Sequence, residues 1–128
     1  MFKLSQKADY GLILLSTLRK SRGSLSIATV AAKHKISSKY LSQIAQELKK
    51  AGILASKEGV TGGYSLAKKA TDIKILDVLK VLDGELVKGE CFDSDHECMC
   101  GARDMWGEMR EQMEVTMGKK TVADLVSS

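Results

Sequence analysis

Long apolar runs and a disulfide framework are both missing from this sequence of 128 residues. No stretch approaches 18 consecutive apolar residues, so we expect neither a membrane span nor a signal peptide. The three cysteines are odd in number and closely spaced, which does not fit an oxidised secreted scaffold. A cytoplasmic protein with a metal or redox site fits this usage better.

Catalytic motifs are also missing. The two histidines, His34 and His96, lie far apart, and no Ser/His/Asp or paired-carboxylate pattern accompanies them. The glycine-containing stretch 58–63 is too short for a nucleotide-binding P-loop and has no Lys-Ser/Thr after it. We therefore expect that the protein is not an enzyme and has no small-molecule substrate.

The charge is divided unevenly along the chain. Residues 1–60 carry 11 Lys or Arg against 3 Asp or Glu, whereas residues 71–128 carry 7 against 13. A basic first half suggests a polyanionic partner such as double-stranded DNA, although solubilising surface charge is the simpler alternative.

The order of predicted elements is that of a winged helix. Hydrophobic periodicity predicts helices over 5–20, 27–35 and 39–50. Strands over 53–57 and 64–67, joined by a glycine-containing turn, follow directly. Three helices followed by a hairpin indicate a mainly α fold with a small β-hairpin, a winged helix-turn-helix.

The predicted third helix has two different sides. Leu41, Ile44 and Leu48 mark its inner face, and the outer face is polar and basic. The first turns of such a helix meet base edges, and a wing contacts phosphates. The candidate DNA-binding residues are Ser38, Lys39, Tyr40, Ser42, Gln43, Lys49, Lys57, Thr61 and Gly62.

A fourth helix is expected over 72–83, capped by Thr71-Asp72 and ended by Gly84. A long C-terminal helix is expected from about Arg103. One side of it carries Trp106 and four methionines, Met105, Met109, Met113 and Met117.

Such an apolar stripe packs in a core or at a subunit interface. Because it follows a complete winged helix, we expect it to pair with the same helix of a second subunit, as a dimerisation helix. We also expect a short last helix that begins with a capping box at Thr121. The expected parts are a DNA-binding domain, 1–84, a cysteine loop, 85–102, and the dimerisation and last helices, 103–128.

All three cysteines fall within the stretch 91–100, as Cys91, Cys98 and Cys100, with His96 between them. Thiolates this close suit an iron–sulfur cluster, and with His96 they also suit zinc. A disulfide-based redox switch is a third possibility. Spacing alone leaves these three alternatives open.

Several of these features together resemble one family. They are the opening Lys7-Ala8-Asp9-Tyr10, the wing ending Gly62-Gly63-Tyr64, the cysteine loop and Cys100-x5-Trp106. In this combination and order the chain resembles the Rrf-two family of bacterial winged-helix regulators, which includes the Isc, Suf and nitric-oxide-sensing repressors. The resemblance implies a homodimer that binds a partly palindromic operator. It also implies a 2Fe-2S or 4Fe-4S cluster on three cysteines.

The chain departs from the cluster-assembly regulators of that family at three places, the first being its C-x6-C-x-C spacing in place of three evenly spaced cysteines. Arg103 stands where they have a histidine as fourth ligand, and arginine is not a plausible ligand. Asp9 matches the aspartate that completes the cluster from the other subunit in the nitric-oxide-sensing branch, and His96 is the local alternative. Glu58 stands where a wing arginine enters the minor groove, with Lys57 as a substitute.

The function expected from these features is that of a repressor which senses iron–sulfur status, redox stress or nitric oxide, and which controls cluster-assembly genes. The alternatives are a zinc-binding or thiol-switched regulator, or a metal-handling protein that does not bind DNA.

Overall fold

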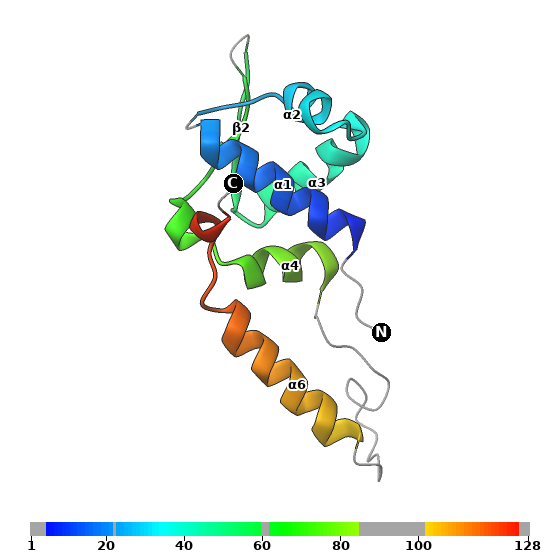
Figure 1. The fold of residues 1–128 in the computed structure, drawn as a ribbon. Coiled ribbons are helices and arrows are strands. Elements are labelled where there is room, and N and C mark those ends of the chain that lie inside the picture. Colours follow the sequence, from blue (N-terminus) through cyan, green and yellow to red (C-terminus); the bar gives the residue numbers. More distant parts are fainter. Residues whose placement is uncertain (1–4, 22, 60–61, 85–101, 126–128) are drawn as a thin grey trace.

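The computed structural model describes residues 5–21, 23–59, 62–84 and 102–125. Figure 1 shows a cluster of helices with a hairpin at one end and a long helix extending from the other. The elements in chain order are α1 Gln6–Ser21, α2 Ile27–His34, α3 Ser38–Lys50, β1 Leu54–Lys57, β2 Gly63–Leu66, η1 Ala70–Asp72, α4 Ile75–Asp83, α6 Ala102–Met117 and η2 Val122–Asp124. The expected mainly α fold with a two-stranded hairpin is confirmed.

Serine hydroxyls begin the first three helices. The backbone N–H of Ala8 donates to Ser5 Oγ at 3.0 Å, and the N–H of Thr29 donates to Ser26 Oγ at 3.1 Å. Ser37 accepts from the N–H of Tyr40 in the same way. Each hydroxyl satisfies a donor that the helix itself leaves unpaired. Local sequence therefore sets where these helices begin, within a residue of the prediction.

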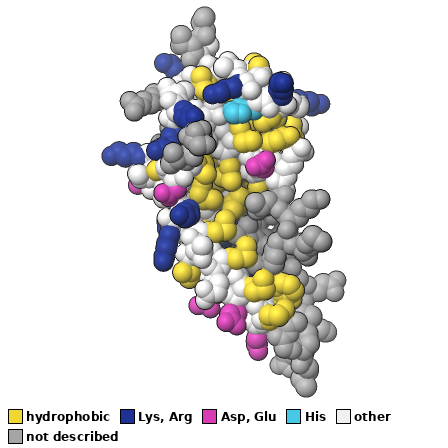
Figure 2. Space-filling model, viewed as in Figure 1, with side chains coloured by type: hydrophobic (Ala, Val, Ile, Leu, Met, Phe, Trp, Pro, Cys, Tyr) yellow, Lys and Arg dark blue, Asp and Glu magenta, His cyan; other side chains and the backbone are white. Residues whose placement is uncertain are grey.

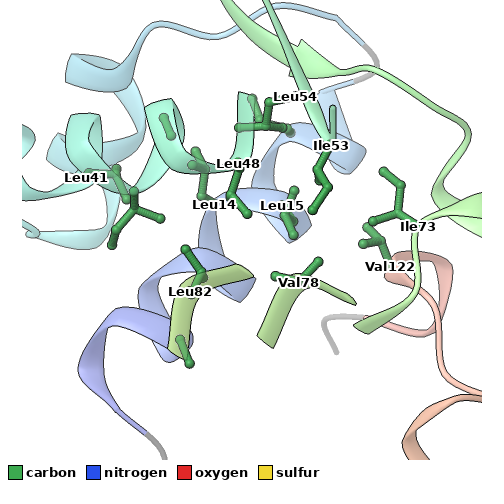
Figure 3. Packing of buried hydrophobic residues seen from close by; sticks show 14 of the residues in the cluster. Leu14, Leu15, Leu41, Leu48, Ile53, Leu54, Ile73, Val78, Leu82 and Val122 are labelled. Carbon is green, nitrogen blue, oxygen red and sulfur yellow. The ribbon is translucent and has the colours of Figure 1, made fainter. Parts of the chain in front are cut away.

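The core lies where α1, α3 and α4 meet (Figure 3). The inner face of α3 is buried as predicted, with Leu41 and Leu48 fully covered. Leu14 of α1 and Val78 of α4 pack in the same cluster. Val122, from the C-terminal segment, is also fully buried there, which periodicity did not predict. The chain therefore returns after α6 to close the core of its first half.

The hairpin is joined to the chain before α2. β1 and β2 pair antiparallel, with Leu54 opposite Leu66. Leu25 forms an additional antiparallel bridge with Tyr64, through hydrogen bonds of 3.0 and 2.8 Å. Gly63 has a φ of +153°, and a Cβ there would collide with the backbone of Leu25. The absence of a side chain at Gly63 therefore allows the wing to pair with the helix-turn-helix.

The predicted start of α4 was wrong. The helix begins at Ile75, and neither Thr71 nor Asp72 caps it. Ile73 is extended and its carbonyl accepts from the N–H of Val122 at 2.9 Å, while Lys74 forms an antiparallel bridge with Thr121. This long-range pairing draws the preceding residues out of the helix, so the local capping signal is overridden.

The shorter α4 buries one face against the core. Its buried residues are Ile75, Val78, Leu79 and Leu82. Leu76 is only half-buried and Val81 is exposed. The predicted end at Gly84 is confirmed, since its N–H donates to Lys80 O at 2.9 Å.

The long helix α6 extends away from the core (Figure 1). Its last residue, Met117, packs against the core, whereas the Met105 side chain near its beginning is 49% exposed. The expected capping box follows, because the N–H of Thr121 donates to Asp124 Oδ2 at 2.8 Å and begins η2. In the described part of the chain, no helix combines the length and the apolarity needed to cross a membrane.

Candidate DNA-binding surface and metal-ligand residues

The outer face of α3 is the first part of the candidate DNA-binding surface. Ser38, Lys39, Gln43 and Lys49 are exposed, and Ser42 is half-buried. The opposite face of the same helix is completely buried, so the rotation of α3 about its axis is determined by the core. Amide and ammonium groups on such a face can donate to base edges and phosphates.

Tyr40 differs from the other predicted contacts on α3. Its ring is half-buried and meets the ring of Tyr10 edge to face, with centroids 5.8 Å apart and planes at 74°. Edge-to-face contacts of this kind stabilise aromatic pairs. The Tyr40 ring therefore holds the first turn of α3 against α1, and only its exposed part remains for a partner.

The wing is the second part of the surface. Lys57 and Glu58 are exposed at the end of β1, as is Gly59, which has a φ of +112°. The N–H of Gly62 donates to Gly59 O at 2.9 Å, and a Cβ at Gly62 would collide with the carbonyl of Lys57. Gly62 is therefore needed for the tight return of the chain. Thr61 lies outside the described residues.

Two polar contacts that the sequence did not reveal hold this surface in place. Lys7 Nζ lies 2.7 Å from Glu47 Oε2, which joins the start of α1 to α3. Ser5 Oγ donates to the Asp83 carboxylate at 2.7 Å, which joins the start of α1 to the end of α4. Both pairs are far apart in sequence, so no local pattern indicates them.

The expected metal ligands are divided between described and undescribed residues. Cys91, Cys98, Cys100 and His96 lie outside the described residues, so their placement stays a prediction. Asp9 is exposed near the start of α1. Within 5–21, 23–59, 62–84 and 102–125, no three His, Cys, Asp or Glu side chains gather as a metal site.

A winged helix with an exposed polar helix and a wing defines the class of a transcriptional regulator. The family model for Rrf2 (Rrf-two), described as "Iron-dependent Transcriptional regulator", matches residues 4–128. The chain belongs to this family. It is 35% identical over 130 residues to "Protein rrf2" of Nitratidesulfovibrio vulgaris, a match that covers 97% of this chain and 87% of that protein.

Solved structures agree with this assignment. The structure titled "CymR (YrzC) the Global Cysteine Regulator of B. subtilis" superposes with a TM-score of 0.83 at 30% identity, covering 98% of this chain and 96% of that one. The structure of T. potens IscR gives a TM-score of 0.80, also at 30% identity, and covers 96% of this chain and 85% of that one. Regulators with different names, CymR and IscR, thus share this fold.

Proposed function

We propose that this Rrf2-family regulator is a homodimeric repressor that binds a partly palindromic operator through α3 and the wing. The observation that carries the proposal is the two-sided character of α3. Its four inner residues are fully buried, while Lys39 and Gln43 of its first turns are exposed. The buried side fixes the helix and leaves the exposed side for the major groove.

The proposed contacts fall into two kinds. Lys39, Ser42 and Gln43 read base edges, because they lie in the first turns of the helix and carry amide, hydroxyl or ammonium groups. Lys49, at the far end of α3, and Lys57, on the wing, neutralise phosphates. Ser38 and the exposed part of Tyr40 lie beside these base contacts, and Thr61 and Gly62 complete the wing.

The signal is proposed to be received by an iron–sulfur cluster, 2Fe-2S or 4Fe-4S, on Cys91, Cys98 and Cys100. Three closely spaced thiols are suitable donors for such a cluster, whereas Arg103 is not. Asp9 is exposed on α1 and is therefore accessible to a second subunit as the fourth ligand. His96 is the alternative fourth ligand. When bound, the cluster would supply sensitivity to iron, oxygen or nitric oxide.

Contacts among the described residues connect the end of α4, which precedes the cysteine-containing segment, to the DNA-binding surface. Asp83 ends α4 just before the cysteine-containing segment, and its carboxylate accepts from Ser5, the cap of α1. Lys7, two residues further along, pairs with Glu47 of α3. A change after α4 would shift the population between two settings of α1 and α3, and so change operator affinity.

Anaerobically purified protein tests the proposal. Retention of promoter DNA that weakens as salt rises is expected, because each neutralised phosphate releases counterions. Visible absorption with bound iron is expected from the cluster, whereas zinc would be colourless. No DNA retention in either the metal-loaded or the metal-free form would exclude the regulator and leave a metal-handling protein.

Single substitutions separate the two fourth-ligand proposals. If Asp9 is the fourth ligand, the Asp9→Ala variant should lose its cluster faster in air than the parent. The His96→Ala variant should then lose its cluster at the same rate as the parent. The reverse result would assign His96. Equal loss rates in both variants and the parent would exclude both residues.

A thiol switch is the second candidate. The relative titled "the Global Cysteine Regulator" has the same fold, so thiol or cysteine status is a reasonable signal for a chain with clustered cysteines. Colourless protein whose DNA affinity changes reversibly with a dithiol reductant would favour this candidate over the cluster.

A further inference from the structure

A hollow of about 520 Å³ runs along α1 beside the end of α2. Its walls include the half-buried apolar side chains of Leu12, Ile13 and Leu125. A second hollow, of about 330 Å³, shares Thr17 and the two lysines of the first. Hollows of roughly 300–1,000 Å³ with apolar walls and a few polar groups are typical of small-molecule sites.

The charges that line the hollow are segregated. Lys20, near the end of α1, and Lys33, near the end of α2, are exposed and line both hollows. His34 lies next to Lys33 in the same lining. Asp9 is the acidic residue of the lining, and it lies 11 residues before Lys20, roughly 16 Å away along the helix axis. One end of the hollow is therefore cationic, with apolar walls beyond it.

A buried hydroxyl sets the position of the histidine. Thr17 is only 7% exposed, and its Oγ1 donates to the Ile13 carbonyl at 2.8 Å. Because a hydroxyl has one proton, the 2.9 Å contact between Thr17 Oγ1 and His34 Nε2 requires the imidazole to donate. His34 is thereby held at the edge of the hollow. In Figure 2 exposed hydrophobic side chains lie close to Lys and Arg side chains near the top of the molecular surface.

We propose that this hollow is an effector site for a small organic carboxylate with an aliphatic body. The carboxylate lies between Lys20 and Lys33, and the aliphatic body covers Leu12 and Ile13. The two ammonium groups favour the anion, and the apolar walls favour a body of several methylene groups over a short acid. Neither the family assignment nor the proposed DNA contacts require such a site. Asp9, at the opposite end of the lining from the two lysines, is the residue that also has a role in the proposed cluster.

Effector binding has a consequence that rests on the proposed function. α2 is the first helix of the helix-turn-helix and packs directly against α3. His34 ends α2, and Lys35 follows in the left-handed conformation at the turn into α3. A ligand held between α1 and α2 would change how α2 supports α3, and therefore the affinity for the operator.

Hexanoate, acetate and hexylamine are matched probes for this site. Added to the full-length protein without DNA, hexanoate is expected to shift the amide resonances of Leu12, Thr17 and Lys33 in a saturable way. Acetate lacks the aliphatic body and hexylamine lacks the negative charge, so both should bind at least about tenfold more weakly. Equal binding of hexylamine would show that the hollow binds apolar chains without recognising the carboxylate, and would overturn the proposal.

The paired variant Lys20→Ala/Lys33→Ala tests the anion contact. It should weaken hexanoate binding about tenfold, because both ammonium groups that attract the carboxylate are lost and exposed charges contribute modestly. The matched control Lys68→Ala/Lys69→Ala removes two exposed lysines that lie outside the hollow and should bind hexanoate like the parent. Unchanged binding in the first variant would overturn the proposal, as would no binding in the parent.

A second copy of the chain covering the hollow would also prevent binding. Saturable hexanoate binding by a monomeric variant but not by the dimeric parent identifies this outcome, which overturns the effector site without affecting the proposed DNA binding. Conversely, saturable hexanoate binding by protein that retains no operator DNA would keep the site and exclude the regulator.

Discussion

At the scale of single residues, two glycines, one at the start of β2 and one in the loop after α1, carry different constraints. Gly63 has a positive φ, and a side chain there would meet the backbone of Leu25 and Ser26. Gly23 has no positive φ, and a Cβ placed there would meet nothing closer than the Ser21 carbonyl oxygen, at 3.9 Å. The same substitution therefore separates a required glycine from a permissive one.

Gly63→Ala is expected to lower the free energy of unfolding by about 1–3 kcal/mol, because the strained backbone and the contact with Leu25 both oppose a Cβ. Urea unfolding followed by circular dichroism measures this change. The control, Gly23→Ala, should stay within about 0.5 kcal/mol of the parent. Equal stability of the two variants would contradict the role of Gly63 in joining the wing to the helix-turn-helix.

Asp124 carries a pH-dependent contribution to stability. The backbone N–H of Thr121 donates to its carboxylate and, as the main cause, lowers the pKa of Asp124 below its ordinary 3.8. A lowered pKa in the folded state stabilises the protein above the unfolded value, and this stabilisation is lost as pH falls through the folded value. The pH window is therefore below about 3.8.

Carbon-13 titration of the Asp124 carboxyl should give a midpoint below 3.8. Thr121→Val removes the weaker hydroxyl contact at 3.3 Å but keeps the backbone donor, so most of the lowering should remain. A midpoint at the ordinary value in the parent would show that the capping box does not form in solution.

At the scale of elements, the helices whose boundaries follow from local chemistry were predicted well. α1, α2 and α3 each begin at a serine cap, and the inner face of α3 follows its apolar spacing. α4 was misplaced because Lys74 pairs with Thr121, a contact between distant parts of the chain. Local signals cannot reveal such a pairing.

In the candidate DNA-binding surface too, features set by local sequence were predictable and long-range contacts were not. The exposed positions of Lys39 and Gln43 follow from the periodicity of α3, because the buried face determines its opposite. The contacts that hold α3 in place, such as Lys7 with Glu47, join residues 40 positions apart and needed the structure. The ligand roles of the cysteines rest on sequence and resemblance and stay predictions.

The core side of α3 gives a stability prediction. Leu48 is fully buried, so Leu48→Ala should lower the free energy of unfolding by about 2–5 kcal/mol through lost burial and the cavity left behind. Val81 is 36% exposed on α4, and Val81→Ala should cost much less. Thermal and urea unfolding of the two variants measure the difference, and equal losses would place Leu48 outside the core.

The outer side of α3 gives a binding prediction. Gln43→Ala should reduce discrimination against a changed operator base by about 1–3 kcal/mol, because it removes a base-edge contact. Lys49→Ala should weaken binding to all sequences alike and reduce the slope of log affinity against log salt by about one. Fluorescence anisotropy on matched and mutated operators at several salt concentrations tests both, and identical signatures for the two variants would contradict the proposed division of roles.

At the scale of the whole molecule, α6 is an amphipathic helix whose apolar stripe the described chain covers only in part. Met117 at its end packs against the core, but Met105 at the other end is half exposed. Met105, Met109 and Met113 follow one side of the helix at a spacing of four residues. Val115 is equally exposed, at 52%, but lies off that stripe.

If the methionine stripe joins two subunits, Met105→Glu should place a charge in the seam and convert the dimer to a monomer at micromolar concentration. The subunit itself should remain folded, because Met105 is already exposed within one chain and its replacement leaves the core intact. Val115→Glu is the matched control, since it adds the same charge to the same helix on a side away from the stripe, and it should remain dimeric. Sedimentation velocity measures the mass, and circular dichroism shows whether each variant is folded.

Since a palindromic operator needs two joined α3 helices, the monomer should also lose cooperative binding to the full operator while still binding a half-site weakly. A Met105→Glu protein that stays dimeric, or a parent that is monomeric, would place the subunit contact elsewhere and leave the stripe to the chain's own packing.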